Sequence, residues 1–293
     1  MRQLGTGLPA ALTTAAVLLT GACGVSALGE ESILAKDSWV VGVKGDEPGM
    51  GKRDAAGRYS GFDVDVAREI ARRLGKSVTF TTVTSGQRDD FIADGKVDLV
   101  VASYTITPER KTKVAFAGPY YVAHQDILIR DSDGDKIKNV RDLAERRVCG
   151  VGGSLSIRRV RNILRERGLT PSEVNASGYS DCLELLRSGR LDAVSTDDLI
   201  LAGLAVEGRR QGGPPLRLVN APFSEEPYGV GMNREDVDGC ERVNRVITDM
   251  YRDGWMEKKL AEWFRGTGLP LSATLPQFEG CDATAPSSSP SSS

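Results

Sequence analysis

The stretch "FIADGKVDLVVAS" (91–103) decides the fold, because the chain repeats its pattern in "LLRSGRLDAVSTD" (185–197). Each begins with the apolar end of a helix, continues through a glycine and a basic residue, and becomes an apolar strand that ends in polar residues. A helix that leads directly into a buried strand is the building pattern of α/β folds. Its repetition predicts two α/β lobes of similar construction.

Helices and strands also alternate around the first of these stretches. "SWVVGVK" (38–44) and "SVTFTTV" (77–83) have the apolar and β-branched composition of strands. Between them, "GFDVDVAREIARRLG" (61–75) places an apolar residue at every fourth position and ends at a glycine, which predicts a helix. The alternation restarts after the polar turn "DSDGDKIKN" (131–139). We therefore expect right-handed βαβ units and a parallel sheet.

The residues at and just after the end of the stretch 91–103 could bind a carboxylate. Ser103 and Thr105 stand two positions apart at a strand end, so their hydroxyls point the same way. Arg110 follows Pro108 at the start of a helix, and its guanidinium can turn back toward them. A guanidinium with hydroxyl and amide donors beside it suits a carboxylate. Taken singly, Arg110 is also consistent with a solvated helix charge and Thr105 with a helix cap.

The strand in the stretch 185–197 ends at Asp197, which could receive an ammonium group. Ligands bind at the carboxyl ends of strands in open α/β sheets, so two such ends facing each other would form a cleft. A carboxylate binder in one lobe and an ammonium acceptor in the other would specify an α-amino acid. The alternative for Asp197 alone is a helix N-cap.

An export signal opens the chain. Residues 1–22 carry a single charged residue and the apolar run "LPAALTTAAVLL" (8–19), which is too short to span a bilayer comfortably. Small residues precede Cys23 in "LLTGACG" (18–24), an arrangement that resembles a bacterial lipobox, in which a peptidase cuts before the cysteine and lipid is attached to its thiol. Ordinary secretory cleavage is the alternative. We expect a lipid-anchored chain with a flexible linker at 23–37.

The composition excludes other function classes. The 293 residues carry a net charge of −2 with acidic and basic residues interspersed, which argues against a nucleic-acid partner. No later stretch approaches about eighteen apolar residues in a row, so lipid would be the only attachment to a membrane.

Four cysteines remain after the lipidation candidate: Cys149, Cys182, Cys240 and Cys281. Export to an oxidising compartment favours disulfides, and the four thiols allow three pairings. Proximity in the sequence favours Cys149 with Cys182 and Cys240 with Cys281. The absence of a CxxC spacing and the single histidine, His124, argue against a zinc site, and no metal or cofactor is expected.

Several long motifs resemble the solute-binding proteins of polar amino-acid ABC transporters, the bacterial extracellular solute-binding proteins of family 3. The motifs that carry the resemblance are "GFDVDVAREIARRLG" (61–75), "VASYTITPERKTKVAFAGPYYVA" (101–123), "LDAVSTDDLILAG" (191–203), "FSEEPYGVGM" (223–232) and "DGWMEKKLAEWF" (253–264). The likeness covers residues 38–266, and within the family it is greatest to actinobacterial glutamate-binding lipoproteins.

The resemblance implies a type II periplasmic binding protein fold, in which two α/β lobes are joined by two crossover strands that act as a hinge. Residues 38–122 and 219–266 would form lobe 1, and residues 127–216 lobe 2. Residues 267–281 would form a C-terminal extension and the Ser/Pro-rich 282–293 a disordered tail.

The resemblance also implies which residues hold the backbone of an amino acid. Ser103, Thr105 and Arg110 match positions that bind the α-carboxylate, and Asp197 matches the position that takes the α-ammonium. A loop at a helix start would offer further donors to the carboxylate from the second lobe. In that loop Ser154 matches a family hydroxyl, Leu155 replaces the second one, and Ser156 could supply the missing donor.

Selectivity for the side chain would come from other positions. Lys44, Ser85 and Arg88 match positions that contact the side-chain carboxylate in binders of acidic amino acids, and Tyr179 is a further candidate contact. Burying a carboxylate requires a paired charge, so two cations here favour glutamate or aspartate. Glutamate is expected first, with aspartate and the amides left open.

The expected protein is a monomer outside the cytoplasmic membrane that captures an acidic amino acid and delivers it to a permease and its ATPase. An enzyme of the dehydratase type is one rival, although Asp197 is the only candidate general acid or base in the predicted cleft. A sensor module that reports amino-acid levels to a kinase is another.

Overall fold

The computed structural model describes residues 31–281, and the described residues from Ser32 onward belong to one compact unit. The predicted signal peptide, the lipidation candidate Cys23 and the predicted disordered tail lie outside the described residues. None of the described helices is long and apolar enough to cross a membrane.

The first lobe is built from both ends of the described chain. It contains β1 (Ser38–Val43), α1 (Phe62–Arg73), β5 (Ser77–Thr82), α2 (Arg88–Ala93), β6 (Leu99–Val100), α3 (Pro108–Lys111), α7 (Val237–Arg252) and α8 (Trp255–Phe264). A small separate sheet of β2 (Asp46–Glu47), β3 (Gly51–Arg53) and β4 (Tyr59–Ser60) joins β1 to α1. The sequence patterns did not predict this small sheet, because strands of two or three residues are too short to show a period.

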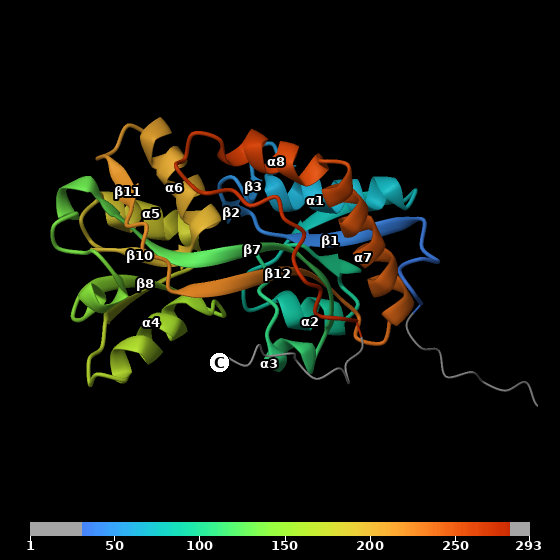
Figure 1. Cartoon of the computed structure of the whole chain (residues 1–293), viewed down its shortest axis with the longest axis horizontal. Coiled ribbons are helices and arrows are strands. Elements are labelled where there is room, and N and C mark those ends of the chain that lie inside the picture. The colour runs from blue at the N-terminus through green and yellow to red at the C-terminus, as the bar shows by residue number, and fades with distance from the viewer. Residues whose placement is uncertain (1–30, 282–293) are drawn as a thin grey trace, which may run out of the picture. The chain divides into compact units, whose positions relative to one another are not determined.

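The second lobe is built from the middle of the chain. It contains two 3₁₀ turns (Asp131–Asp133 and Val140–Leu143), β8 (Arg147–Val151), α4 (Ser156–Arg165), β9 (Ser172–Ala176), α5 (Tyr179–Arg187), β10 (Val194–Asp197), α6 (Asp198–Arg210) and β11 (Leu216–Leu218). The long strand β7 (Ala115–Arg130) and the returning strand β12 (Ser224–Met232) lie side by side and connect the lobes (Figure 1).

The main sheet is mixed, and the expectation of a parallel sheet is wrong for half of it. The parallel part is as predicted, with β5 and β6 on either side of β1. The strands β10, β11 and β12 all pair antiparallel with β7. The reason is the single strand β7, which runs through both lobes, so every strand that returns along it has the opposite direction.

The helix–glycine–strand pattern of residues 91–103 and 185–197 is present in both lobes. Helix α2 ends before Gly95, and helix α5 ends before Gly189, and both glycines have a positive φ, of 63° and 74°. Glycine adopts this left-handed conformation without a steric penalty, which lets the chain turn sharply from helix into strand. The strands that follow, β6 and β10, end at the same cavity.

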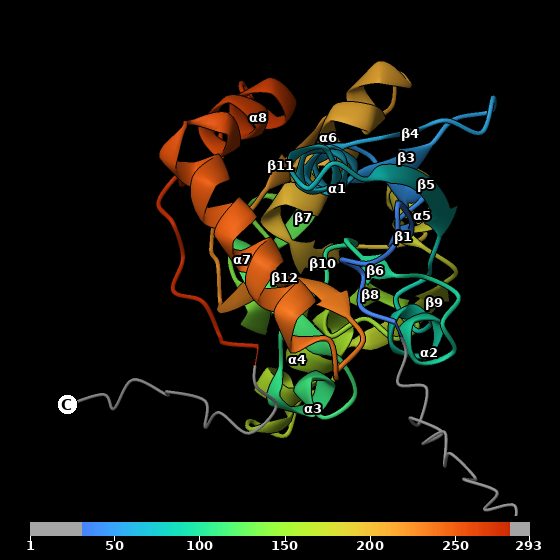
Figure 2. The ribbon, with the colours of Figure 1, turned by 90° about the vertical axis from the view of Figure 1, so that its right-hand side faces the viewer.

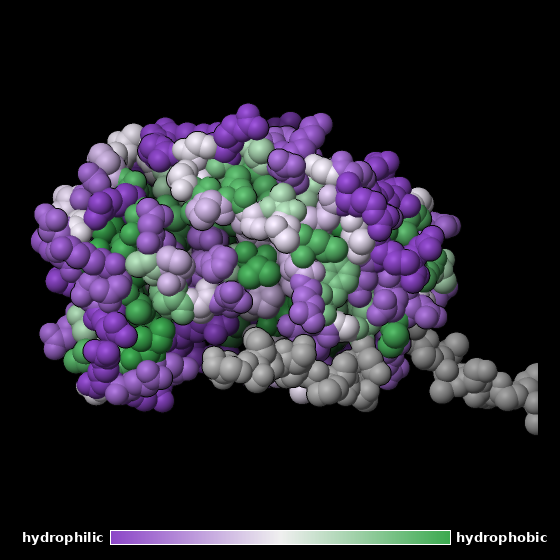
Figure 3. Space-filling model, viewed as in Figure 1, coloured by the Kyte–Doolittle hydropathy of each residue, from purple (hydrophilic) through white to green (hydrophobic). Residues whose placement is uncertain are grey.

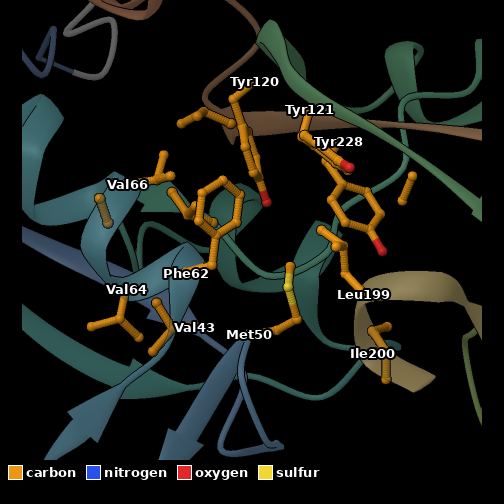
Figure 4. Close-up of a cluster of buried hydrophobic side chains, with 14 of the residues drawn as sticks. Val43, Met50, Phe62, Val64, Val66, Tyr120, Tyr121, Leu199, Ile200 and Tyr228 are labelled. Carbon is orange, nitrogen blue, oxygen red and sulfur yellow. The ribbon is translucent and has the colours of Figure 1, made fainter. Parts of the chain in front are cut away.

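Apolar side chains from both lobes form a continuous core. Figure 4 shows Met50 and Phe62 of the first lobe beside Leu199 and Ile200 of helix α6, and all of them are buried. On the face shown in Figure 3, hydrophilic residues cover much of the outer helices α7 and α8, and apolar residues appear as separate small areas. Lobe contact is thus partly hydrophobic and not limited to the polar cavity.

Both predicted disulfides are confirmed. Cys149–Cys182 joins β8 to α5, and Cys240–Cys281 joins α7 to the segment that follows α8, each with 5.8 Å between the Cα atoms. That segment runs back beside α7 (Figure 1, Figure 2), where Glu279 N donates to Gly118 O. Loop closure of this kind stabilises a fold by about 2–4 kcal/mol per bond.

Candidate functional site

A small polar cavity lies at the carboxyl ends of β6 and β10. Its lining comes from both lobes: Glu47, Ser85, Arg88, Ser103, Thr105, Arg110, Ser154, Leu155, Ser156, Tyr179, Thr196, Asp197, Ile200 and Glu226. Every residue that the sequence predicted as a ligand contact lines it, except Lys44. Its volume of about 20 Å³ leaves room for about one water molecule, so an amino acid can enter only when the two sides move apart.

The first lobe contributes a cationic wall, defined here as Ser85, Arg88, Ser103, Thr105 and Arg110. Arg88 donates to three backbone carbonyls, those of Ser85, Ala102 and Ser103, each at 3.0 Å. Arg110 donates to Thr105 O at 2.8 Å. Among the residues that the structure describes, no carboxylate lies within salt-bridge distance of either guanidinium.

Burial and mutual repulsion both act on these arginines. Burial, then the nearby Arg88, lowers the pKa of Arg110 to about 10. Both guanidinium groups lie over the ring of Tyr104, at 4.5 Å for Arg88 and 4.9 Å for Arg110, where the negative face of the ring partly offsets their charge. An anion in the cavity would relieve the repulsion that remains.

Ser103 is held in a strained backbone conformation. Its φ of 42° is unusual for a residue with a side chain, and such strain persists where the surroundings enforce it. Asp63, at the start of α1, accepts from Ser103 N at 2.7 Å and from the Tyr120 hydroxyl at 2.6 Å. Burial raises the pKa of Asp63 to about 7, although the bond from Tyr120 opposes that rise.

Lys44 is the exception among the predicted contacts. It is buried behind the cavity, where its Nζ lies 2.9 Å from Glu47 Oε1 and donates to the Ser85 hydroxyl at 2.9 Å. Lys44 was predicted to contact the side-chain carboxylate of the ligand, but it does not line the cavity in this structure, and Glu47 offsets its charge. Glu47 itself lines the cavity and accepts from the Ser103 hydroxyl at 2.8 Å.

The second lobe contributes a hydroxyl wall, defined here as Ser154, Ser156, Tyr179 and Thr196. The Tyr179 hydroxyl is its centre and lies 2.9 Å from Ser154 Oγ, 3.2 Å from Ser156 Oγ and 2.8 Å from Thr196 Oγ1. Burial raises the pKa of Tyr179 to about 12, so its hydroxyl keeps the proton. Hydroxyls can donate or accept, which lets this wall adapt to a ligand.

Asp197 lies beside the hydroxyl wall and has no cationic partner among the described residues. It accepts from the Tyr228 hydroxyl at 2.5 Å, and no basic side chain of the described residues forms an ion pair with it. Burial, and then the nearby Glu226, raises the pKa of Asp197 well above its usual value. An ammonium group placed here would favour the ionised form.

Glu226 supplies a further carboxylate, and this one is paired. It lies on β12, and Arg159 of α4 contacts both of its oxygens, at 2.6 and 2.8 Å. Ser224 donates to it at 2.7 Å. This ion pair connects a hinge strand to the second lobe.

Among the charged residues that line the cavity and their ion-pair partners, the formal charges leave an excess of one positive charge when Asp197 is counted as ionised. Lys44 offsets Glu47, and Arg159 offsets Glu226. Arg88 and Arg110 then face Asp197 alone. Buried charge is costly unless it is paired, so the site favours a ligand that brings one net negative charge.

Sequence reasoning missed several cavity residues: Glu47, Thr196, Ile200 and Glu226. Glu47 follows Lys44 by three positions and Thr196 precedes Asp197, so local spacing could have indicated these two. Glu226 and Arg159 are 67 positions apart, and nothing local in the sequence joins them.

Outside this cavity, the single histidine and the possible metal ligands of the described residues were the remaining candidates for chemistry. His124 is partly exposed, and its Nδ1 lies 3.6 Å from Asp198 Oδ2. Within residues 31–281, no three His, Cys, Asp or Glu side chains are placed to hold a metal ion.

A wider vestibule of about 450 Å³ adjoins the cavity and shares Ser85, Arg110, Ser154 and Leu155 with it.

Known proteins resemble this chain in sequence and in fold. Residues 39–266 match the family model of bacterial extracellular solute-binding proteins, family 3. The glutamate-binding protein GluB of Corynebacterium efficiens is 35% identical over 86% of this chain and 89% of its own length, and the ABC transporter glutamine-binding protein GlnH of Bacillus subtilis is 32% identical over 85% and 93%.

Solved structures agree with the sequence relatives. An ancestral arginine-binding protein bound to arginine superposes with a TM-score of 0.70 and 31% identity, covering 78% of this chain and 99% of its own. The matched range 39–266 includes strands and helices of both lobes. The chain belongs to the bacterial extracellular solute-binding proteins of family 3.

Proposed function

We propose that this protein captures an acidic amino acid, glutamate in the first place, outside the cytoplasmic membrane and delivers it to an ABC importer. One observation carries the choice of ligand: two buried guanidinium groups, Arg88 and Arg110, face one unpaired carboxylate, Asp197. Glutamate carries one net negative charge and would balance the cavity. A neutral amino acid would leave one buried cation unpaired.

Each charged group of glutamate has a partner of the right sign. The α-carboxylate would lie against Arg110 with Ser103 and Thr105, which are at the end of the first-lobe strand. The α-ammonium would lie against Asp197. Arg88 would then pair with the side-chain carboxylate, and Ser85, held by Lys44, would donate beside it. Ser154, Leu155 and Tyr179 would close over the ligand from the second lobe.

The names of relatives support an amino-acid ligand but leave its side chain open. Relatives named for glutamate and for glutamine differ by only a few per cent in identity to this chain. Whole-chain identity therefore does not decide between an acid and its amide. The local charge excess favours the acid.

The lobe boundaries proposed from the sequence are 38–122 with 219–266, and 127–216. Their basis is that β7 and β12 pass from one lobe to the other, and bending of these two strands would open the cavity. Ligand contacts to both walls would favour the closed form in proportion to the affinity that they add.

Attachment by lipid at Cys23 is proposed on the lipobox-like sequence alone. A Cys23→Ser variant should lose incorporation of a labelled fatty acid and appear in the medium. Equal labelling of both proteins would contradict the anchor.

A thermal-shift screen of the twenty amino acids tests the proposed function. A ligand that binds only the folded state raises the melting temperature, and each hundredfold excess over Kd adds about 2.7 kcal/mol. Glutamate should give the largest shift, with aspartate next. A largest shift with arginine, or no shift with any amino acid, would contradict the proposal.

A further inference from the structure

Asp46 makes a hydrogen-bonded contact between the lobes, next to the cavity. This residue lies in β2 of the first lobe, and its Oδ2 accepts from Tyr179 N at the start of α5 at 2.8 Å. The Ser180 hydroxyl donates to the backbone oxygen of Asp46, also at 2.8 Å. Two bonds therefore hold β2 against the first turn of a second-lobe helix.

Helix α5 depends on this contact because it has no cap of its own. The residue before the helix is Gly178, which has no side chain that could accept from the first free N–H groups. Asp46 supplies the missing acceptor from the other lobe. Its negative charge also suits the positive end of the helix.

The approach is so close that a side chain at position 178 would displace the Asp46 carboxylate. A Cβ atom there would lie 1.9 Å from Asp46 Oδ2. The φ of Gly178 is −168°, an extended conformation that any residue adopts. The backbone conformation at position 178 therefore does not require glycine, but the contact with Asp46 does. A similar approach lies nearby, where a Cβ at Gly203 of α6 would lie 1.7 Å from Pro48 O.

The contact is connected to the cavity on both sides. Glu47, the neighbour of Asp46, lines the cavity from the first lobe. Tyr179, whose backbone Asp46 binds, carries the hydroxyl at the centre of the hydroxyl wall. Asp46 itself does not line the cavity, so it would act on a ligand through Tyr179.

We propose that Asp46 is an interlobe latch, a positioning residue that caps α5 only in the closed form and thereby slows release of the ligand. The proposal rests on the proposed function, since it assumes a ligand held by closure. Opening of the lobes would remove Asp46 from Tyr179 N and leave that N–H to water. The latch should therefore affect dissociation and not association.

Stopped-flow kinetics with the amino acid that gives the largest thermal shift tests the latch. Asp46→Ala removes the acceptor, and Gly178→Ala blocks its approach. Each single variant should raise the dissociation rate about tenfold, the size of effect expected for loss of an N-terminal cap, with the association rate within about twofold of the parent. In the double variant the blocking methyl no longer meets a carboxylate, so the rate should equal that of Asp46→Ala.

The matched control is Asp54→Ala, because Asp54 pairs with Arg58 within the first lobe and touches no residue of the second. It should leave both rates unchanged. A dissociation rate for Asp46→Ala within twofold of the parent would overturn the latch. A dissociation rate in the double variant that equals the product of the two single fold-increases would also overturn the latch, because it would show that the two substitutions act independently.

Small-angle X-ray scattering of the ligand-free protein separates this proposal from the proposed function. Asp46→Ala and Gly178→Ala should each increase the radius of gyration, and Asp54→Ala should not. If no amino acid binds, the proposed function fails, and the scattering comparison alone decides the latch. Equal radii for all variants would then overturn it.

Discussion

The two walls of the cavity differ in the groups that they offer to a ligand: one offers buried positive charge and the other offers neutral hydroxyls. In the cationic wall, both Arg88 and Arg110 donate hydrogen bonds to backbone carbonyls, which fix the direction of their guanidinium groups. The hydroxyl wall is a set of neutral groups bonded to one another around Tyr179. Fixed charge selects a ligand by its charge, whereas hydroxyls can reorient to accept or donate. If the proposed ligand binds here, we expect selectivity to reside mainly in the first lobe and retention in the second.

Removal of Arg110 should have the largest effect on affinity. Arg110→Ala takes away the proposed partner of the α-carboxylate, which every amino acid carries, and truncation of one member of a buried charge pair costs about 2–5 kcal/mol. Affinity for all amino acids should fall by at least about a hundredfold in calorimetry. The control is Lys111→Ala, on the same short helix, whose Nζ contacts Glu279 and not the cavity. Retention of glutamate binding by Arg110→Ala would contradict the role of the cationic wall.

Asp63 behind the cationic wall should make stability depend on pH. Its pKa is raised to about 7 by burial, above the ordinary value of 3.8, so the folded form holds a proton that the unfolded form releases. The stability from this group is fully present below pH 4 and is lost as pH rises through about 7, a change on the order of a few kcal/mol.

The Asp63→Asn variant tests that dependence. Urea unfolding of both proteins between pH 4 and 8 should show a smaller loss of stability with rising pH in Asp63→Asn than in the parent. Parallel profiles for the two proteins would show that Asp63 does not titrate in this range.

Removal of Arg88 should change selectivity more than overall affinity. Arg88→Ala deletes the group assigned to the side-chain carboxylate, so glutamate should lose roughly ten- to a hundredfold in affinity and glutamine clearly less. Calorimetry with both ligands measures the ratio directly, and thermal unfolding controls for loss of the bonds to Ala102 and Ser103. An unchanged glutamate-to-glutamine ratio would remove Arg88 from the selectivity site.

The smallest effect is expected in the hydroxyl wall. Tyr179→Phe removes one hydroxyl with several partners, a loss of about 1 kcal/mol, so affinity for all amino acids should fall by about three- to tenfold without a change in their ranking. Tyr251→Phe is the control, because the Tyr251 hydroxyl donates to Tyr120 O outside the cavity. A larger effect on glutamate than on glutamine would place charge recognition in the second lobe as well.

Local patterns predicted the parts of the fold that local physics determines. The period of α1, the glycine turns before β6 and β10, and Arg110 after Pro108 are all set by residues close in sequence. The hydroxyls at the strand ends followed from the general position of ligands in α/β sheets. Parallel pairing failed as a general expectation, because β7 serves both lobes and its partners return along it.

The sequence did not predict which charged side chains pair with one another. Lys44 was predicted to contact the side-chain carboxylate of the ligand, yet it lies behind the cavity and pairs with Glu47, which lines the cavity. The pairing of Glu226 with Arg159 depends on how β12 passes α4. The predicted preference for an acidic ligand is retained here for a different reason, since Arg110 replaces Lys44 as the second unpaired cation.

The affinity ratio of glutamate to glutamine is the most direct test of the excess positive charge in the cavity. The two ligands have nearly the same size and differ by one charge, so calorimetry at pH 7 and low salt isolates the electrostatic term. The account predicts that glutamate binds at least about tenfold more tightly, a difference of about 1.4 kcal/mol. Equal affinities, or tighter binding of glutamine, would contradict it.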